Sequence, residues 1–260
     1  MLSIIDEKYR KFREKGYRGA LNDMKYRELR DLGYSGSLND MQRSRRLTTP
    51  FNPSSLLEGN MGLFADFSTG EGVGEETPTS LEVGGYIWSK RNSPQLVEQG
   101  LLFDRDNNDL LIAGQDLASV VDDYPLTMAM HVVSTDAGSI DFGIIEGVAG
   151  YYTLRASVSG SFYAVTRNDN YISSKIEGTP QDITLIGDFR ADQTGLYTQD
   201  QGPVYHTSEP SLVSNATEIS LGGLSDSTPD YGSGVVKSIF LVNRSLTEEE
   251  RANLIDYMRT

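Results

Sequence analysis

Cysteine is absent from this 260-residue chain, and histidine and tryptophan occur only twice and once. Without cysteine the chain can form no disulfide and offers no thiolate as nucleophile or metal ligand. Of the two histidines, His131 and His206, the first sits inside an apolar run that predicts a strand, where a histidine is more often a packed core residue than a catalytic base. No Ser/His/Asp set and no zinc-ligand cluster can be assembled around them.

Long apolar runs are missing as well. No stretch approaches the ~20 apolar residues that a bilayer-spanning helix needs. The start, Met1–Ile5, leads straight into charged residues, which predicts that the chain has no signal peptide.

Basic residues are scarce outside the N-terminal segment. Residues 1–47 hold 12 Lys and Arg against 7 Asp and Glu, whereas the remainder holds 11 against 30. The two parts therefore carry net charges of +5 and −19. A globule this acidic repels nucleic acid and anionic membranes, so we expect neither as a partner.

The C-terminal segment carries the clearest local pattern. Residues 235–242 form an apolar run, with Val235, Ile239 and Leu241 expected on one face and Val236, Phe240 and Val242 on the other. A strand that is apolar on both faces must be covered on both, which predicts a layered sheet structure. Thr247 and Glu250 have capping-box spacing, which predicts a helix whose Leu254, Ile255 and Met258 share a buried face.

This segment, SIFLVNRSLTEEERANLIDYM, resembles the closing strand and helix of concanavalin A-like jelly rolls of the laminin G-like kind. About a dozen short apolar runs separated by turns precede it, from residues 61–67 onward, at the spacing of a sandwich. We therefore expect a mainly β fold, an antiparallel two-sheet jelly-roll sandwich over residues 60–260 with a C-terminal helix. Because a fold hosts many functions, the resemblance alone does not fix an activity.

An internal repeat occupies the N-terminal segment. Residues 9–24 (YRKFREKGYRGALNDM) and 26–41 (YRELRDLGYSGSLNDM) align with a period of 17, with 10 of 16 positions identical. Each unit predicts a short charged helix that ends at Gly16 or Gly33 and restarts after a turn with Asn or Asp as N-cap. A helical pair this small has no core of its own, so it must pack on something else. A Pro- and Ser-rich linker, residues 48–59, separates this arm (residues 1–47) from the β domain.

The GYxG[AS]LNDM unit resembles short repeats in structural proteins of tailed bacteriophages. This resemblance implies a virion component, a homo-oligomer attached to other virion proteins through its arm. A generic amphipathic helical pair is the alternative. Arm residues expected to dock on a partner are apolar or aromatic in each repeat and basic in the short tail that follows: Tyr17, Leu21, Met24, Tyr34, Leu38, Met41, Arg43, Arg45 and Arg46.

The residues give no sign of catalysis. Some jelly rolls of this superfamily are glycosidases with an E-x-D-x-x-E strand motif, and the nearest match, residues 139–146, lacks the first Glu. Its Asp141 and Glu146 are five residues apart and would lie on opposite faces of a strand. The glycine loop at residues 70–76 has three glutamates and no P-loop Lys, which argues against nucleotide binding. We expect a non-enzymatic protein without a required cofactor.

Calcium is a candidate ligand, because members of the family often bind it in rim loops. The candidate ligands are Asp104, Asp106 and Asn108, although turn formation explains the same residues. Tyrosines in the strands and loops of the sandwich could stack on sugar rings, although packing explains most of them. They are Tyr151, Tyr152, Tyr163, Tyr171, Tyr197, Tyr205 and Tyr231. The expected function is a virion structural protein that displays a lectin-like domain and binds host-surface glycans. The alternatives are a polysaccharide-degrading enzyme and a non-viral carbohydrate-binding adhesin.

Overall fold

The computed structural model describes residues 51–114, 125–146, 150–168, 170–179, 181–190, 193–207, 217–223 and 232–260, together with Arg27 and Arg30. The chain divides into two compact units, Met1–Phe51 and Asn52–Thr260. The division falls inside the predicted linker, residues 48–59. Part of that linker, Pro53–Leu57, forms a 3-10 helix, η1, which belongs to the second unit.

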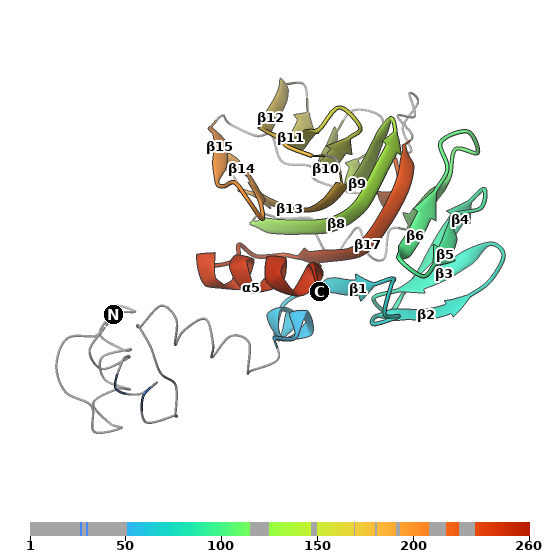
Figure 1. Ribbon diagram of the computed structural model, residues 1–260, viewed down its shortest axis with the longest axis horizontal. Helices are drawn as coiled ribbons and strands as arrows, with labels where there is room; N and C mark the ends of the chain where they lie inside the picture. Colours follow the sequence, from blue (N-terminus) through green and yellow to red (C-terminus); the bar gives the residue numbers. More distant parts are fainter. Residues whose placement is uncertain are drawn as a thin grey trace. The chain divides into compact units, whose positions relative to one another are not determined.

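The described residues of the second unit form a sandwich of two antiparallel sheets, with the α-helix α5 (Glu248–Met258) on the outer face of the first sheet (Figure 1). This confirms the predicted fold class. Sheet A runs in the order β15 (Val204–Thr207), β14 (Gln193–Thr198), β13 (Gln181–Phe189), β8 (Leu126–Ala137), β17 (Ser233–Val242), β6 (Gly100–Phe103) and β5 (Gln95–Val97), and β1 (Gly62–Asp66) also pairs with β17. Sheet B runs in the order β12 (Asn170–Glu177), β11 (Ser161–Asn168), β10 (Gly150–Ser157), β9 (Ser139–Glu146), β16 (Glu218–Leu221), β7 (Leu110–Ala113), β4 (Tyr86–Arg91), β3 (Ser80–Val83) and β2 (Val73–Glu76).

Strand β17 is central to sheet A, as its two apolar faces predicted. It pairs with β8 along one edge, and with β6 and then β1 along the other. Its residues Ile239 and Leu241 face the core between the sheets, and Phe240 and Val242 are buried on the other face. The predicted grouping is wrong for Val236, which joins the core face, because register shifts on either side of it interrupt the alternation.

The sequence pattern did not predict four strands of the N-terminal half, β2 to β5. Strand β2 lies in the stretch predicted as a glycine loop, and three of its four residues are exposed. Its sequence therefore lacks the apolar alternation that marks a half-buried strand. The apolar runs on either side of residues 104–109 form β6 and β7, and the turn between them carries the chain from sheet A to sheet B.

Helix α5 begins with the predicted capping box. The Glu250 amide donates to Thr247 Oγ1 (3.2 Å) and the Thr247 amide donates to Glu250 Oε2 (2.8 Å). Leu254 and Met258 are fully buried against sheet A, whereas Ile255 is only half-buried. The helix thus covers the outer face of the sheet where β17 would otherwise expose apolar side chains. None of the described helices is long and apolar enough to cross a membrane.

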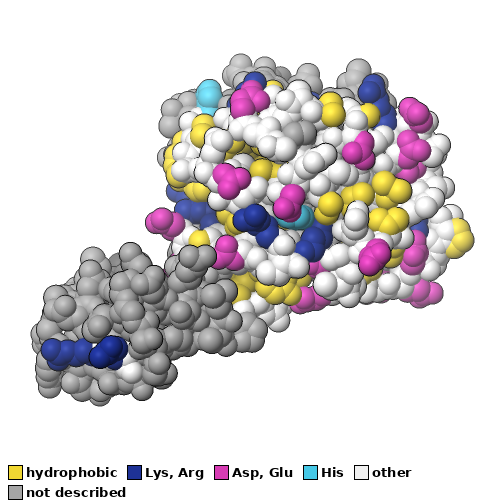
Figure 2. Space-filling view, viewed as in Figure 1, with side chains coloured by type: hydrophobic (Ala, Val, Ile, Leu, Met, Phe, Trp, Pro, Cys, Tyr) yellow, Lys and Arg dark blue, Asp and Glu magenta, His cyan; other side chains and the backbone are white. Residues whose placement is uncertain are grey.

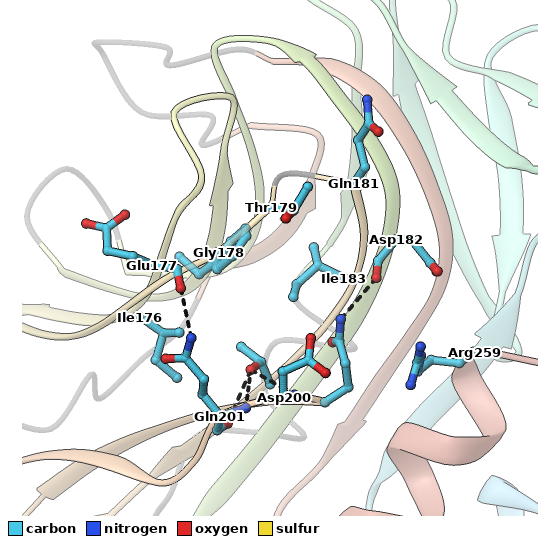
Figure 3. A pocket seen from close by; sticks show the side chains of 13 residues that line it. Ile176, Glu177, Gly178, Thr179, Gln181, Asp182, Ile183, Asp200, Gln201 and Arg259 are labelled. Carbon is cyan, nitrogen blue, oxygen red and sulfur yellow. Dashed lines mark hydrogen bonds between the residues drawn. The ribbon is translucent and has the colours of Figure 1, made fainter.

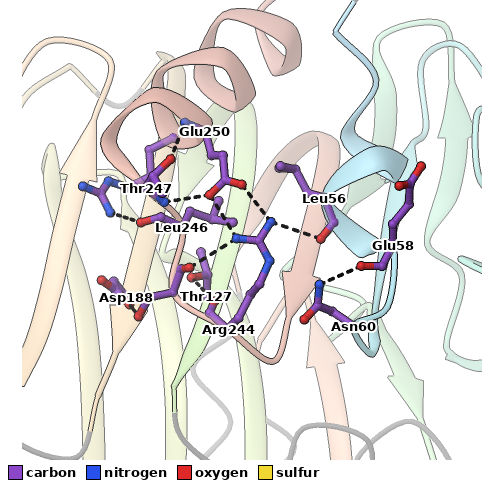
Figure 4. A network of polar contacts seen from close by, with 11 residues as sticks. Leu56, Glu58, Asn60, Thr127, Asp188, Arg244, Leu246, Thr247 and Glu250 are labelled. Carbon is purple, nitrogen blue, oxygen red and sulfur yellow. Dashed lines mark hydrogen bonds and ion pairs between the residues drawn. The ribbon is translucent and has the colours of Figure 1, made fainter. Parts of the chain in front are cut away.

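Asn243 and Arg244, which follow β17, connect this part of the chain to the start of the domain, and Figure 4 shows the contacts of Arg244 with Glu250 and Leu56. The Asn243 side chain accepts a hydrogen bond from the Met61 amide (3.0 Å). The Arg244 guanidinium donates to both carboxylate oxygens of Glu250 (3.0 and 3.1 Å) and to the carbonyl of Leu56 in η1 (3.3 Å). The motif that carried the laminin G-like resemblance therefore has a structural role.

Candidate binding pocket

A hollow of about 400 Å³ opens at the end of the sandwich where the chain crosses from β12 in sheet B to β13 in sheet A (Figure 3). Four separate segments line it. They are β11 with Phe162, the end of β12 with the β12–β13 connection and the start of β13, the turn between β14 and β15, and Arg259 at the end of α5. Apolar side chains of Phe162, Ile176 and Ile183 are buried beneath it and belong to the core.

Two glutamine side chains fix the β14–β15 turn against its neighbours. Gln199 Oε1 accepts from the Thr184 amide (2.9 Å) while its Nε2 donates to the carbonyl of Asp182 (3.1 Å). Gln201 Nε2 donates to the carbonyl of Glu177 at the end of β12 (3.0 Å). The pocket walls are therefore tied together across both sheets before any ligand binds, which lowers the cost of ordering them.

A buried histidine supports the wall at the start of β13. His131 Nδ1 lies 2.9 Å from Thr184 Oγ1, and His131 Nε2 lies 3.3 Å from Asp182 Oδ1. Because a carboxylate only accepts, the proton belongs on Nε2, and Nδ1 then accepts from the threonine hydroxyl. Burial lowers the pKa of His131 to about 4, with the charge of Asp182 opposing the shift, so the ring is neutral at neutral pH. Asp182 itself has φ +51°, a conformation rare for a non-glycine residue, which this set of bonds holds in place.

Sequence reasoning expected His131 to be a satisfied core residue, and the structure agrees, since its side chain is 2% exposed. Its link to Thr184 and Asp182 was missed. The three residues come from β8 and β13, which pair in register with His131 opposite Thr184. A strand pairing of this kind leaves no local signal in the sequence.

Side chains of both negative and positive charge line the pocket. The Glu177 carboxylate pairs with Lys175 and accepts from Ser161 Oγ (2.9 Å), and these two hydrogen bonds, the first above all, hold the pKa of the Glu177 carboxyl below its usual value. Asp200 is exposed in the β14–β15 turn. Arg259 reaches from the end of α5 toward this turn (Figure 3), and within the described part of the chain its guanidinium makes no hydrogen bond or ion pair. The pocket thus keeps charged groups available to a ligand.

A second hollow of about 400 Å³ lies near β4 and β5. Lys90 and Glu76, which line it, already form an ion pair with each other. We therefore regard the pocket at Arg259 as the stronger candidate site. Across the visible face of the sandwich, acidic side chains are spread widely and basic ones occur singly or in small groups (Figure 2).

In the stretch that comes nearest to a glycosidase motif, residues 139–146, Asp141 forms an ion pair that is structural. Asp141 is fully buried on β9, and its two carboxylate oxygens accept from Arg155 Nε and Nη2 on β10 (2.7 and 3.0 Å). Its neighbours Ile140 and Phe142 face the core between the sheets, so Asp141 points to the outer face of sheet B. The side chain of Glu146 lies outside the described residues.

The predicted calcium loop is the turn between β6 and β7. Both carboxylate oxygens of Asp104 accept hydrogen bonds inside the turn, from the Asp106 amide and the Asn107 side chain (2.9 Å each). Asn108 has φ +54°, as turn-forming asparagines often do. These bonds match the turn-forming explanation. Among the described residues there is no group of three or more His, Asp or Glu that could hold a metal ion, and calcium binding here stays a prediction.

The predicted docking residues of the arm all lie outside the described residues: Tyr17, Leu21, Met24, Tyr34, Leu38, Met41, Arg43, Arg45 and Arg46. Of this segment only Arg27 and Arg30 are described, both helical and exposed. Their assignment as partner contacts remains a prediction.

Comparison with known proteins adds evidence on the fold. No protein-family profile and no curated protein matches the sequence. Similar solved structures include a Trypanosoma rangeli sialidase in complex with 2,3-difluoro-KDN, with a TM-score of 0.56 at 13% identity over 77% of this chain and 33% of the sialidase. The binding domain of botulinum neurotoxin DC, in complex with rat synaptotagmin II, has a TM-score of 0.56 at 8% identity over 77% of this chain and 52% of that one.

A structure of botulinum neurotoxin type C, which needs two ganglioside molecules to enter cells, has a TM-score of 0.56 at 10% identity over 80% of this chain and 53% of the toxin chain. The chain thus spans about a third of the sialidase and about half of the toxin chains. At such low identity the likeness shows the fold alone. The chain shares with them the antiparallel two-sheet β-sandwich fold.

Proposed function

We propose that this chain is a non-enzymatic structural component of a tailed-phage virion, whose β-sandwich domain binds host-surface glycans in the pocket at Arg259. The observation that carries the glycan proposal is the pocket itself. It combines amide, carboxylate and guanidinium groups over an apolar floor, and its walls are held by side-chain hydrogen bonds. Its volume suits a small ligand such as one or two sugar rings.

The fold neighbours support this proposal without testing it. The botulinum neurotoxin type C structure concerns ganglioside binding, and ganglioside headgroups are glycans. The virion part of the proposal rests on the N-terminal repeats, whose likeness to repeats of tailed-phage proteins implies attachment through residues 1–47. The non-enzymatic part is supported by Asp141 on β9, the strand that came nearest to a glycosidase motif, because its carboxylate is bound to Arg155 on β10.

Glycan binding is tested on the full chain with an array of bacterial surface glycans. We expect Arg259→Ala and Asp200→Asn each to weaken binding about tenfold, since a hydrogen bond to a charged group is lost. Arg105→Ala and Asp256→Asn, which remove exposed charges elsewhere, serve as matched controls and should bind like the parent chain. Equal binding by pocket and control variants would overturn the assignment, and hydrolysis of a bound glycan would overturn the non-enzymatic proposal.

Attachment to the virion is tested by mass spectrometry of purified particles. Deletion of residues 1–47, or Leu21→Asp together with Leu38→Asp, should leave a folded chain that particles no longer take up, because apolar docking residues are removed or charged. Normal copy number with either variant would refute the arm as the anchor.

A further inference from the structure

Tyr205 lies on β15, the edge strand of sheet A, and its side chain is 42% exposed. It stands directly opposite Gly195 on β14. A Cβ added at Gly195 would lie 2.8 and 3.0 Å from Tyr205 Cε1 and Cδ1, so the ring packs on the glycine backbone. An aromatic ring that covers a glycine on the neighbouring strand has one side supported by the sheet and the other open to solvent.

The ring is held in this position by Tyr197. The two hydroxyl oxygens are 2.5 Å apart, and the rings meet edge to face with centroids 6.0 Å apart at 88°. Tyr197 is itself buried and lies beneath the Arg251 guanidinium of α5, 4.3 Å from its ring centroid. Tyr205 therefore loses little conformational freedom when a ligand packs on it.

An Arg190–Asp188 ion pair lies in the same row across sheet A, since Asp188 on β13 is opposite Gly195 on β14 and Gly195 is opposite Tyr205. The Arg190 guanidinium donates from Nε and Nη2 to Asp188 Oδ2 (2.9 and 2.6 Å), and Asp188 is buried while the Arg190 side chain is 35% exposed. The other Asp188 oxygen accepts from Ser245 Oγ (2.8 Å). The exposed part of this pair offers N–H donors and adds no net charge of its own, which suits an uncharged polar ligand.

An open aromatic ring flanked by hydrogen-bond donors is complementary to a pyranose. A gluco- or galacto-configured ring presents a patch of C–H groups on one side and hydroxyls around its rim, and aromatic rings pack on such apolar surfaces. None of Tyr197, Tyr205 and Arg190 lines the pocket at Arg259. The surface made by these residues is therefore separate from the pocket.

We propose that Tyr205, positioned by Tyr197 and flanked by Arg190, forms a second carbohydrate-binding surface that stacks a neutral gluco- or galacto-configured pyranose. Two sites on either side of the β14–β15 hairpin would let one domain hold two segments of the same polysaccharide. Weak single sites then combine into tighter binding to a polymer than to a short oligosaccharide.

The test is saturation-transfer NMR on the full chain with cellopentaose and β-1,4-galactotetraose as probes and mannopentaose for comparison. An Arg259→Ala background removes the pocket's contribution. In that background Tyr205→Ala should lower the affinity for at least one of the two probes about three- to tenfold, the range that an aromatic stacking contact supplies. Tyr205→Phe keeps the ring and should keep the affinity. Ile87→Ala, which removes an exposed apolar side chain from sheet B (65% exposed), is the control.

The outcomes separate this proposal from the pocket proposal. Binding that Arg259→Ala abolishes and Tyr205→Ala leaves intact would refute the second surface while leaving the pocket in place. Binding that Tyr205→Ala weakens and Arg259→Ala does not would support the second surface alone. No binding of either probe to the parent chain, an equal loss in Tyr205→Phe, or self-association of the chain that Tyr205→Ala abolishes, would overturn the second surface.

Discussion

The stability of the sandwich should fall steeply between pH 6.5 and pH 4 because of His131. Burial lowers its pKa from 6.5 to about 4, so between these values the unfolded chain binds a proton that the folded chain does not. Stability therefore rises with pH across this window and is lost as the pH falls through it. The difference between the two pKa values corresponds to about 3 kcal/mol of unfolding free energy, lost in full once the pH is below both values. This is a large share of the stability of an ordinary domain.

The assay is urea unfolding at pH 7 and pH 4, followed by the fluorescence of Trp88, the chain's single tryptophan, which is fully buried. Many carboxylates also titrate in this range, so the informative quantity is the difference between variants. We expect the pH-dependent loss of stability in His131→Gln to be smaller than in the parent chain by about 3 kcal/mol. His206→Gln, at the exposed histidine of β15, should behave like the parent chain.

A pH dependence that is the same in His131→Gln and in the parent chain would refute this reasoning. If the variant does not fold, the imidazole of the parent chain can be titrated by NMR instead. A titration midpoint near 6.5 for His131 would show that burial does not disfavour its charged form, and the prediction would be wrong. A midpoint near 4 would support it.

Three further predictions use the same unfolding assay. Thr247→Ala removes the capping box of α5 and should cost about 1 kcal/mol, and a loss too small to measure would contradict the role of the cap. Arg155→Met takes two hydrogen bonds from the buried Asp141 carboxylate and should cost about 3 kcal/mol at neutral pH, and an unchanged stability would contradict the importance of this ion pair. Gly72→Ala places a Cβ 2.2 Å from a backbone carbonyl oxygen at φ +68°, whereas Gly70→Ala at φ +79° meets nothing within 4 Å. The first should therefore be the more destabilising by at least about 1 kcal/mol, and equal effects would be inconsistent with the close approach.

Where the fold depends on local interactions, the sequence predicted it well. The capping box at Thr247 and Glu250 involves residues three apart, and the strand at residues 139–146 was predicted with its observed ends. The burial of β17 on both faces followed from its composition. Strands without an apolar pattern, such as β2, were missed because their position is fixed by pairing with a neighbour.

Register and the assignment of strands to sheets came from the tertiary structure. The bulges that turn Val236 toward the core depend on how β17 pairs with β8, and no local sequence pattern predicts them. Strands β6 and β7 are both short apolar runs in the sequence, yet they lie in different sheets. Strand pairing joins residues that are far apart in the sequence. Its stabilising energy therefore cannot be inferred from any short stretch of the chain.

The candidate site shows most clearly which features the sequence determines and which the tertiary structure decides. The sequence alone determined the acidic charge of the domain, the lack of thiols and of a motif for zinc or nucleotide, and the kind of fold. Only the tertiary structure brought His131 to Thr184 and Asp182, gathered the pocket from four separate segments, and placed the Tyr205 ring on Gly195. Composition and local pattern set which surfaces must be buried, but the strand pairing that buries them decides which polar side chains meet and which stay exposed.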